Sequence, residues 1–354
     1  MEIVLITNIL AVLFAFLESK KLLKNGLLFS FVIIFIFLSL RFDYGNDYFG
    51  YYKGFQEINR FVNFDLFDKE LHYEPGWIVL CILFKQLGFF WMVAFLSFLY
   101  CYILYKLIKK YVPLKLYWLS VFICVFSIGN LLTQLSSMRQ TLAILIFIIS
   151  IKFINEKRII IFIALILLAS TIHNSALLLL PIYFIQFVNF KFNKFSGGLI
   201  LLLYCSLYVF GENIRPLLNS LVASFNEDYL VYDEKGVLNS GIGLFVLSFF
   251  FILVLMKDRQ YDGEKALLFK LVTLGFLFAP IGLIIMMFGR VSMYFSVFLI
   301  VVYPLVFDSI KSKEIRLAFL VLLVLIIMSS FFDFFESPIW QDKYKEYHTI
   351  FSVN

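Results

Sequence analysis

The sequence predicts an all-α, polytopic integral membrane protein, and three observations lead to this fold class. Of the 354 residues, 62% are hydrophobic and 15% are charged, and the mean hydropathy is +0.93. Soluble domains have about 45–50% apolar and about 25% charged residues, so a water-soluble globular fold is excluded. The apolar residues also form unbroken blocks, such as 159–168 and 317–328, and a transmembrane helix needs about 20 mostly apolar residues.

Apolar blocks separated by polar or basic breaks predict the individual spans. They are 3–17, 26–40, 89–108, 116–133, 139–154, 159–172, 174–188, 196–211, 241–256, 266–288, 291–307 and 317–332. The stretches outside them are the outer loops 41–75 and 212–240 and the C-terminal tail 333–354. The chain is therefore expected to form a single polytopic domain over residues 1–354, with about 12–13 transmembrane helices.

Basic residues in the short connections predict the orientation of these spans. Patches such as 20–24, 106–115 and 311–316 should be cytoplasmic by the positive-inside rule. The segment 76–88 is interrupted by Lys85 and Gly88, and we interpret it as interfacial or re-entrant, so that 89–108 is a single crossing. Both large loops and both chain ends then lie outside. Because the net charge of +6 comes mostly from such patches, no nucleic-acid partner is expected.

Arginine is unevenly distributed between the two predicted sides. Only three of the 18 inner basic residues are Arg, whereas five of the ten outer ones are Arg. Topology requires only positive charge inside, so Arg on the outside needs another cause. The planar guanidinium pairs bidentately with phosphate or carboxylate. Any chemistry is therefore expected to face outward.

The segment that follows the second span combines charge with aromatic rings. It reads Arg-Phe-Asp-Tyr-Gly-Asn-Asp-Tyr-Phe-Gly-Tyr-Tyr from Arg41 onward and contains Asp47 and Tyr51. Aromatic faces stack on sugar C–H groups, and carboxylates accept hydrogen bonds from sugar hydroxyls. Arg41 is expected at the depth of a lipid-linked phosphate. The tyrosines are equally compatible with an interfacial aromatic belt.

Four further positions place polar groups at predicted outer helix ends. Arg139 opens a span, where the helix N-terminus favours an anion, and Arg290 lies beside a glycine at another helix end. Glu74 precedes a Pro-Gly turn. His173, in a polar break between apolar helices, titrates near neutrality and is either a proton carrier or a hydrogen-bonded packing residue. Snorkelling of Arg139 to headgroups and a topological cap at Arg290 remain open alternatives.

The sequence lacks the motifs of several other enzyme classes. It has no phosphate-binding glycine loop, no G-x-S-x-G and no HExxH. Soluble nucleotide donors and hydrolytic triads therefore find no support, and no cofactor is expected. The four cysteines, Cys81, Cys101, Cys124 and Cys205, lie inside apolar blocks at unrelated spacings. We expect buried thiols there, with no disulfide framework and no zinc site.

Taken in order, these motifs resemble the EpsG family of bacterial exopolysaccharide and O-antigen polymerases, the Wzy-like membrane proteins. The matching pieces are Arg41 with Gly45-Asn-Asp-Tyr and Tyr51, Glu74-Pro-Gly, Arg139-Gln-Thr-Leu-Ala, His173-Asn-Ser-Ala, and Arg290 followed by Tyr294-Phe295, with an aromatic tail over 344–351. Asn46 departs from the Thr found in many members. The resemblance implies a GT-C-like membrane fold and a glycosyltransferase at the periplasmic face of the inner membrane.

The implied reaction moves a glycan from one undecaprenyl-pyrophosphate carrier to the sugar of another lipid-linked repeat unit, as in lipopolysaccharide O-antigen synthesis. The implied catalytic residues are Arg139, Arg290, His173 and Asp47, and the implied substrate-binding residues are Arg41, Tyr51, Glu74, Gln140 and Tyr294. The reaction needs no metal if arginines neutralise the leaving group. The expected partners are the lipid-linked oligosaccharide, membrane lipid and a chain-length regulator protein.

Three other functions remain as alternatives. A lipid-linked oligosaccharide flippase or transporter would need charges along a path through the bilayer, but mid-span basic residues are scarce apart from Lys85 and Lys270. An O-antigen ligase uses the same donor and differs in its acceptor, so only the family pattern favours a polymerase. An acyltransferase that decorates glycans needs an acyl-CoA route, which an outward His173 opposes.

Overall fold

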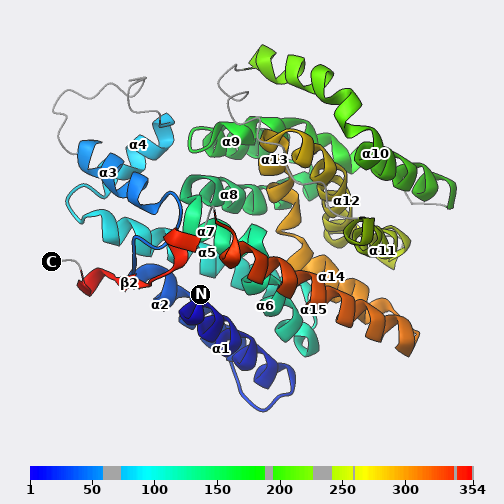
Figure 1. Ribbon diagram of the computed structural model, residues 1–354, viewed down its shortest axis with the longest axis horizontal. Coiled ribbons are helices and arrows are strands. Elements are labelled where there is room, and N and C mark those ends of the chain that lie inside the picture. The colour runs from blue at the N-terminus through cyan, green and yellow to red at the C-terminus, as the bar shows by residue number, and fades with distance from the viewer. Residues whose placement is uncertain (59–72, 188–193, 226–240, 258–259, 339–340, 353–354) are drawn as a thin grey trace. The chain divides into compact units, whose positions relative to one another are not determined.

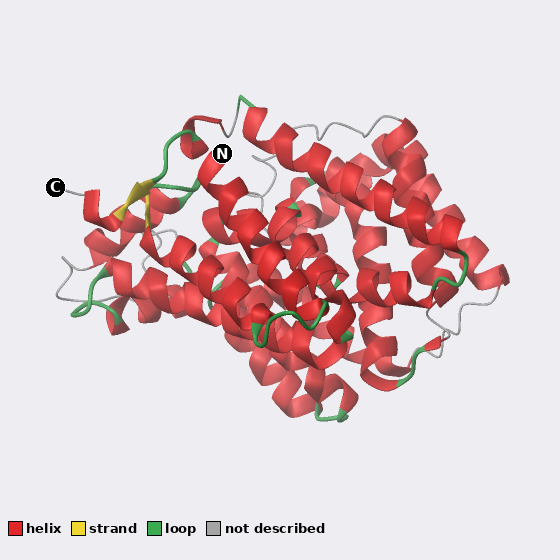
Figure 2. Ribbon diagram, turned by 90° about the horizontal axis from the view of Figure 1, so that it is seen from below, coloured by secondary structure: helices red, strands yellow, loops and turns green. Residues whose placement is uncertain are grey.

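The computed structural model describes residues 1–354 except 59–72, 188–193, 226–240, 258–259, 339–340 and 353–354. The described chain is almost entirely helical, and two short strands, β1 (Arg41–Phe42) and β2 (His348–Thr349), form one antiparallel pair (Figure 2). The chain divides into two compact units. The first comprises 1–151, 160–177 and 323–354, and the second comprises 152–159 and 178–322. The all-α prediction is confirmed.

Apolar helices occur at every predicted span. Among the described residues, five helices are long and apolar enough to cross a membrane, and two bent helix pairs raise this number to seven. Five shorter apolar helices of 10–17 residues lie at 26–40, 159–170, 174–187, 195–211 and 246–257. This composition supports a multi-pass membrane protein. The number of 12–13 spans stays a prediction, because the shorter helices do not by themselves reach the length of a full crossing.

The first unit contains both chain ends (Figure 1). Its elements are α1 (Glu2–Ser19), α2 (Gly26–Leu40), β1 (Arg41–Phe42), α3 (Tyr48–Ile58), α4 (Pro75–Leu83), α5 (Phe89–Tyr111), α6 (Tyr117–Phe126), α7 (Thr133–Ser136), most of α8 (Met138–Asn155) and α9 (Ile159–Ser170), the C-terminal part of α15 (Lys313–Glu336) and β2 (His348–Thr349). The long apolar runs form helices because a helix satisfies its backbone hydrogen bonds within the segment.

Helix α5 crosses the first unit once, from its polar end to its lysine-rich end. At its start, the Phe89 ring lies 5.5 Å from the Tyr48 ring. At its end, the charges of Lys109 and Glu18 interact, and the Trp118 amide donates to Ser19 Oγ at 3.3 Å. The lysine patches at 20–24 and 106–115 therefore share one end of this unit. This agrees with the predicted single crossing over 89–108.

The segment before α5 is too short to form a further crossing. Helix α4 has nine residues, which rise about 14 Å, against a hydrocarbon core about 30 Å thick. Lys85 follows its end, and Gly88, with φ of 97°, caps the start of α5. This geometry fits an interfacial or re-entrant piece. No described contact places it relative to a membrane surface.

The apolar block 116–133 is broken in the middle. Residues 114–126 and 128–136 meet at 54°, because Ser127 has an extended backbone with ψ of 130°. The buried Asn130 side chain donates to the Ile123 carbonyl at 3.4 Å, and Thr133 Oγ1 donates to the Ile128 carbonyl at 3.2 Å. The two side chains thus add hydrogen bonds to backbone carbonyls on either side of the break. The break also determines where the Ser136–Ser137 turn and the start of α8 lie.

Arg41 is fully buried in the first unit, at 0% exposure. Its guanidinium donates from Nη1 to the Leu38 carbonyl at 2.6 Å and from Nη2 to the Gln134 carbonyl at 3.2 Å. It also lies 5.4 Å from the centre of the Tyr48 ring. This differs from the expected contact with an acceptor lipid at headgroup depth. The cause is the break at Ser127, which brings the Gln134 carbonyl within reach of the guanidinium.

The predicted loops are partly helical. Helix α3 and strand β1 lie within 41–75, and residues 59–72 are outside the described residues. In the second unit, α10 (Lys194–Phe225) continues through residues 212–225, so the predicted loop does not begin at 212. The polar residues there occupy helical positions between leucines, and Pro216 is tolerated inside the helix. Residues 226–240 are also outside the described residues.

The second unit is an assembly of five further helices and the adjoining start of α15. They are α10, α11 (Gly241–Lys257), α12 (Gly263–Ile284), α13 (Met286–Ser296) and α14 (Leu299–Ser309). Helices α12 and α13 approach closely at Gly282, which has no side chain; a Cβ there would lie 2.6 Å from the Gly289 backbone. The break between α13 and α14 bends the block 288–309 by 52°.

We predict that Arg41→Lys lowers the thermal unfolding midpoint of the purified protein in detergent. Lysine has a single nitrogen in place of the two guanidinium nitrogens that each donate to one carbonyl, and an unpaired buried carbonyl costs about 1–3 kcal/mol. Arg158→Lys is the matched control, because the Arg158 side chain is 57% exposed in a surface ion pair. Equal midpoints for the two variants would contradict the structural role of Arg41.

Candidate active site

The Glu74-Pro75-Gly76 turn is docked against the chain between α9 and the 3-10 helix η4 (Asn174–Phe187). Pro75 occupies the first position of α4, where a missing N–H does no harm. The Gly76 amide donates to the Thr171 carbonyl at 2.7 Å. A Cβ at Gly76 would lie 2.3 Å from Thr171 Oγ1, so only glycine permits this approach. The turn thereby carries the Glu74 side chain to the segment that holds His173.

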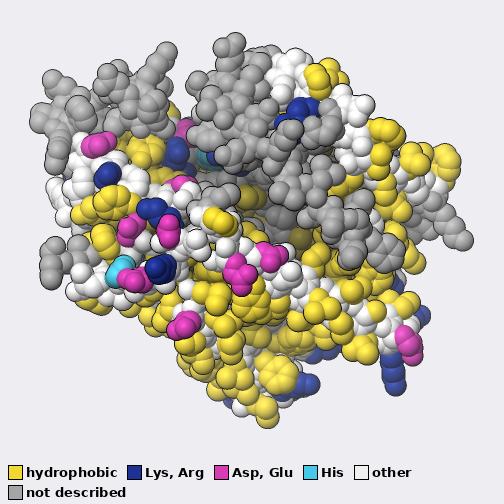
Figure 3. All heavy atoms as spheres, in the orientation of Figure 1, with side chains coloured by type: hydrophobic (Ala, Val, Ile, Leu, Met, Phe, Trp, Pro, Cys, Tyr) yellow, Lys and Arg dark blue, Asp and Glu magenta, His cyan; other side chains and the backbone are white. Residues whose placement is uncertain are grey.

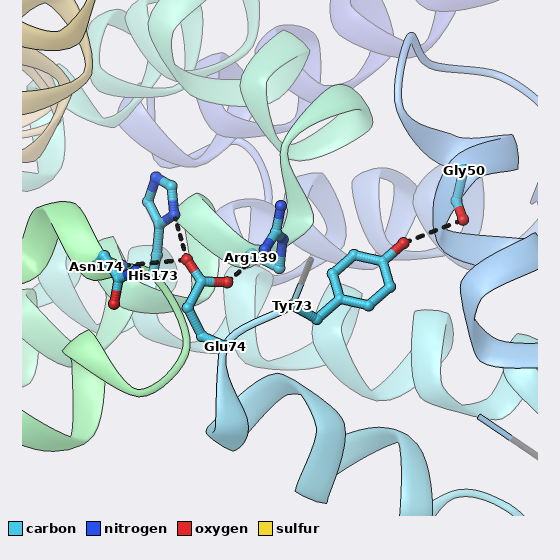
Figure 4. A network of polar contacts seen from close by, with 6 residues as sticks. All are labelled: Gly50, Tyr73, Glu74, Arg139, His173 and Asn174. Atoms are coloured by element: carbon cyan, nitrogen blue, oxygen red, sulfur yellow. Dashed lines mark hydrogen bonds and ion pairs between the residues drawn. The ribbon is translucent and has the colours of Figure 1, made fainter. Parts of the chain in front are cut away.

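The Glu74 carboxylate contacts side chains from two other parts of the sequence (Figure 4). Its Oε2 accepts a short hydrogen bond from Arg139 Nη1, in the first turn of α8. Its Oε1 lies 3.4 Å from His173 Nδ1 and accepts the Asn174 amide at 3.2 Å. We call Glu74, Arg139 and His173 the Glu74 cluster. Their side chains are 12%, 22% and 12% exposed, so the cluster is reachable yet largely shielded from water.

Two tyrosine rings border the Arg139 guanidinium. Its central carbon lies 4.9 Å from the centre of the Tyr73 ring and 5.8 Å from that of Tyr51. The Tyr73 hydroxyl donates to the Gly50 carbonyl at 3.2 Å (Figure 4), and its ring fills the space beside Gly54. Cation–π contacts of this kind stabilise a partly desolvated guanidinium. Helix α3 thus fixes the ring against which Arg139 lies.

The electrostatics of the cluster keep Glu74 ionised. Burial by itself raises the pKa of Glu74, but the contact with His173 and the charge of Arg139 together lower this pKa below its ordinary value of 4.5. Burial raises the pKa of Tyr73 to about 12 and raises that of Tyr51 as well, although the charge of Arg139 opposes both shifts. Both phenols are therefore neutral at pH 7 and can donate hydrogen bonds.

Asp47 lies beside the turn that leads into α8. Gly45 has φ of 137°, and a Cβ there would lie 2.1 Å from the Leu135 carbonyl, so the segment passes directly over this backbone. Ser137 Oγ donates to Asp47 Oδ2 at 3.4 Å, two residues before Arg139. The charge of Asp47 also acts on Tyr51. Asp47 therefore belongs to the surroundings of Arg139, and its side chain is half-buried.

The predicted site residues fall into a half-buried group and a buried group. Tyr51 is 6% and Gln140 is 4% exposed, so both support the site from within and differ from the expected direct contact with substrate. In the second unit, Arg290 on α13 is half-buried, whereas Tyr294 is fully buried. Tyr294 thus packs inside its own unit and is not placed to contact a ligand.

Tyr73 and Asn174 complete the site and were not among the predicted residues. Tyr73 directly precedes Glu74 in the sequence, and an aromatic residue beside a motif carboxylate is the one signal that could have indicated it. The Asn174 contribution is a backbone amide, which no sequence pattern reveals. Among the residues that the structure describes, no three His, Cys, Asp or Glu side chains gather as a metal site.

Comparison with known proteins identifies the family. The family model of the EpsG family matches residues 24–349, nearly the whole chain. The chain belongs to the EpsG family. This is a family of Wzy-like polymerases, so the predicted resemblance is confirmed. The match includes the Glu74 cluster, Asp47 and Arg290. No curated protein and no solved structure matches this EpsG-family chain.

We predict that Gly76→Ala lowers the thermal unfolding midpoint and weakens polysaccharide synthesis, because its Cβ would clash with Thr171. Gly50→Ala is the matched control. It lies in α3, and nothing is within 4 Å of a Cβ at that position, so alanine should be neutral or stabilising. If both variants melt at the same temperature, α4 is not docked on the Thr171 turn as described.

Glu74 gives the protein a stability term that depends on pH. Folding lowers the pKa of Glu74, so its carboxylate stabilises the native state at a pH above the ordinary pKa of 4.5. This stabilisation is lost as the pH falls through the lowered pKa of the folded protein. We expect the wild type to lose its advantage in melting temperature over Glu74→Gln as the pH falls below about 4.5. Glu346→Gln, at a 71% exposed side chain, controls for removing any carboxylate. A constant difference across pH would refute the assignment.

Proposed function

We propose that this EpsG-family protein transfers a glycan from one undecaprenyl-pyrophosphate carrier to the sugar of another lipid-linked repeat unit. The observation that carries the proposal is the Glu74 cluster, in which one carboxylate holds a guanidinium and an imidazole side by side. Glycan transfer from a lipid diphosphate needs a cation for the leaving group and a base for the acceptor hydroxyl. The cluster provides both from residues of a single compact unit.

In this proposal His173 is the general base. With Nδ1 facing Glu74 Oε1 at 3.4 Å, a proton on Nδ1 is directed to the carboxylate, and the lone pair of Nε2 is the proposed proton acceptor. The acceptor oxygen attacks the anomeric carbon and gives its proton to Nε2, while the bond from that carbon to the diphosphate oxygen breaks. Glu74 fixes the tautomer and stabilises the imidazolium that forms, as carboxylates do beside catalytic histidines.

Arg139 neutralises the charge that develops on the departing diphosphate. One of its nitrogens is held by Glu74, and the Tyr73 and Tyr51 rings border the guanidinium. The plane of the guanidinium is therefore set before the substrate arrives, and preorganised donors of this kind typically contribute about 10²–10³-fold to the rate. Arg290 belongs to the second unit, and we propose it as a further cation that the reaction uses. No metal ion is part of the proposed reaction.

Asp47 serves the acceptor sugar in this scheme. Its carboxylate is half-buried beside Ser137, and carboxylates accept hydrogen bonds from sugar hydroxyls. It is also the alternative base if His173 acts only as a packing residue.

The reaction is proposed for the outer face of the bacterial inner membrane. In the first unit, the polar end that contains β1, β2 and α3 lies opposite the lysine-rich turn between α1 and α2. Acidic, basic and histidine side chains gather toward the chain termini, and apolar side chains cover α1 and α6 (Figure 3). Lysine-rich ends are cytoplasmic by the positive-inside rule, which supports an outward-facing cluster. A protein that regulates chain length is the proposed partner, alongside lipid.

The test is complementation of a strain that lacks the gene, with the surface polysaccharide separated on a gel. We expect Arg139→Ala, Arg290→Ala and His173→Gln to collapse the ladder to a single repeat unit, because a general base alone contributes about 10²–10⁴-fold. Arg139→Lys should leave a shortened ladder, since it keeps the charge but loses the planar fork. Arg158→Lys, in an exposed ion pair, should leave the ladder unchanged.

The outcome also separates the proposal from its rivals. A full ladder from Arg139→Ala at normal protein level would overturn the role of the Glu74 cluster. Total loss of surface glycan in the deletion strain would point to a flippase or a ligase, and an unchanged ladder with altered decoration would point to an acyltransferase.

A further inference from the structure

The C-terminal tail after α15 folds back onto the segment that follows α2. Strand β2 pairs with β1, and Arg41 lies opposite Thr349. Two tyrosines of the tail face inward. Tyr347 stacks on Phe37, with ring centres 5.2 Å apart and planes at 18°, and its hydroxyl donates to the Phe37 carbonyl at 2.8 Å. This tyrosine anchors the tail to the end of α2.

The second tyrosine, Tyr344, reaches deeper. It is 1% exposed, and its ring meets those of Tyr44, Phe334 and Phe335 at 5.2, 5.1 and 5.7 Å between centres. These contacts are edge-to-face, so the ring is held firmly. Its hydroxyl is buried and has no hydrogen bond of ordinary geometry to any described residue.

Groups from two different turns interact with this hydroxyl. The Ser136 side chain and the Asn46 backbone both interact with it, and so does the charge of Asp47. Asn46 directly precedes Asp47, and Ser136 lies three residues before Arg139. The Tyr344 hydroxyl is thus placed between the turn that carries the proposed sugar-binding carboxylate and the turn that carries the proposed leaving-group cation.

We propose that Tyr344 is a positioning residue that ties the Asn46–Asp47 turn to the Ser136–Arg139 turn in the substrate-bound protein. Packing alone does not require its hydroxyl, because phenylalanine offers the same ring, and an unpaired buried hydroxyl opposes folding. A small closure of either turn gives the hydroxyl its partners and fixes the distance between Asp47 and Arg139. The inference rests on the proposed function and assigns to the tail a role in that site.

Two matched Tyr→Phe variants test it in purified full-length protein in lipid nanodiscs. The probe is the lipid-linked repeat unit extracted from a strain that lacks the gene. Tyr344→Phe should lower kcat about tenfold with KM within twofold of the wild type, and it should not lower the melting temperature. Tyr347→Phe loses its bond to the Phe37 carbonyl, so it should lower the melting temperature while kcat stays within twofold.

Hydrogen exchange of the unliganded and probe-bound protein gives a readout that does not depend on turnover. Probe binding should slow amide exchange at residues 45–48 and 136–139 in the wild type and in Tyr347→Phe, and slow it less in Tyr344→Phe. Equal kcat and equal exchange in the two variants would overturn the positioning role. A wild type that binds the probe and makes no polymer would instead overturn the proposed function, and the exchange comparison would still decide the role of Tyr344.

Discussion

A carboxylate in a largely dehydrated environment needs compensating partners, and Glu74 finds them on two other segments. Arg139 supplies an opposite charge, and His173 and the Asn174 amide supply further polar contacts. Removing one member would leave a partly buried charge without its partner, which is costly in a low-dielectric environment. The positions of α4, α8 and the turn after α9 therefore depend on one another through this carboxylate.

A second buried cation organises the neighbouring backbone. Arg41 contacts the end of α2 and the broken segment α6–α7 through two carbonyls, and strand β1 is covered by the C-terminal tail. Arg41 and Arg139 have the same side-chain chemistry, but they differ in burial and therefore in what they contact. Arg41 has no exposed surface and holds backbone together, whereas the Arg139 side chain is 22% exposed.

Together, these two arrangements hold polar side chains from distant segments at one end of the first unit. The imidazole, the guanidinium and the Asp47 carboxylate come from separate turns at one end of the first unit. Their spacing is set by backbone docking at Gly45 and Gly76, where a side chain would meet the facing backbone. Glycine at these positions therefore contributes to the site although it bears no functional group, because electrostatic stabilisation requires groups held in place before charge develops.

The sequence by itself determined the helical class, the family and the positions of the apolar helices, since a long apolar run satisfies its backbone only as a helix. For the block 26–40 even the ends agree. It also indicated Glu74, Arg139 and His173 as separate motifs. Only the tertiary structure showed that these three residues meet and that Arg41 and Tyr51 are buried. It also showed that α10 continues through 212–225 and that Tyr344 lies close enough to Asp47 to interact with its charge. Periodicity and composition report the environment along one segment, whereas these contacts join positions 65 to about 300 residues apart, and their partners are chosen by which turns can approach closely enough to exclude water.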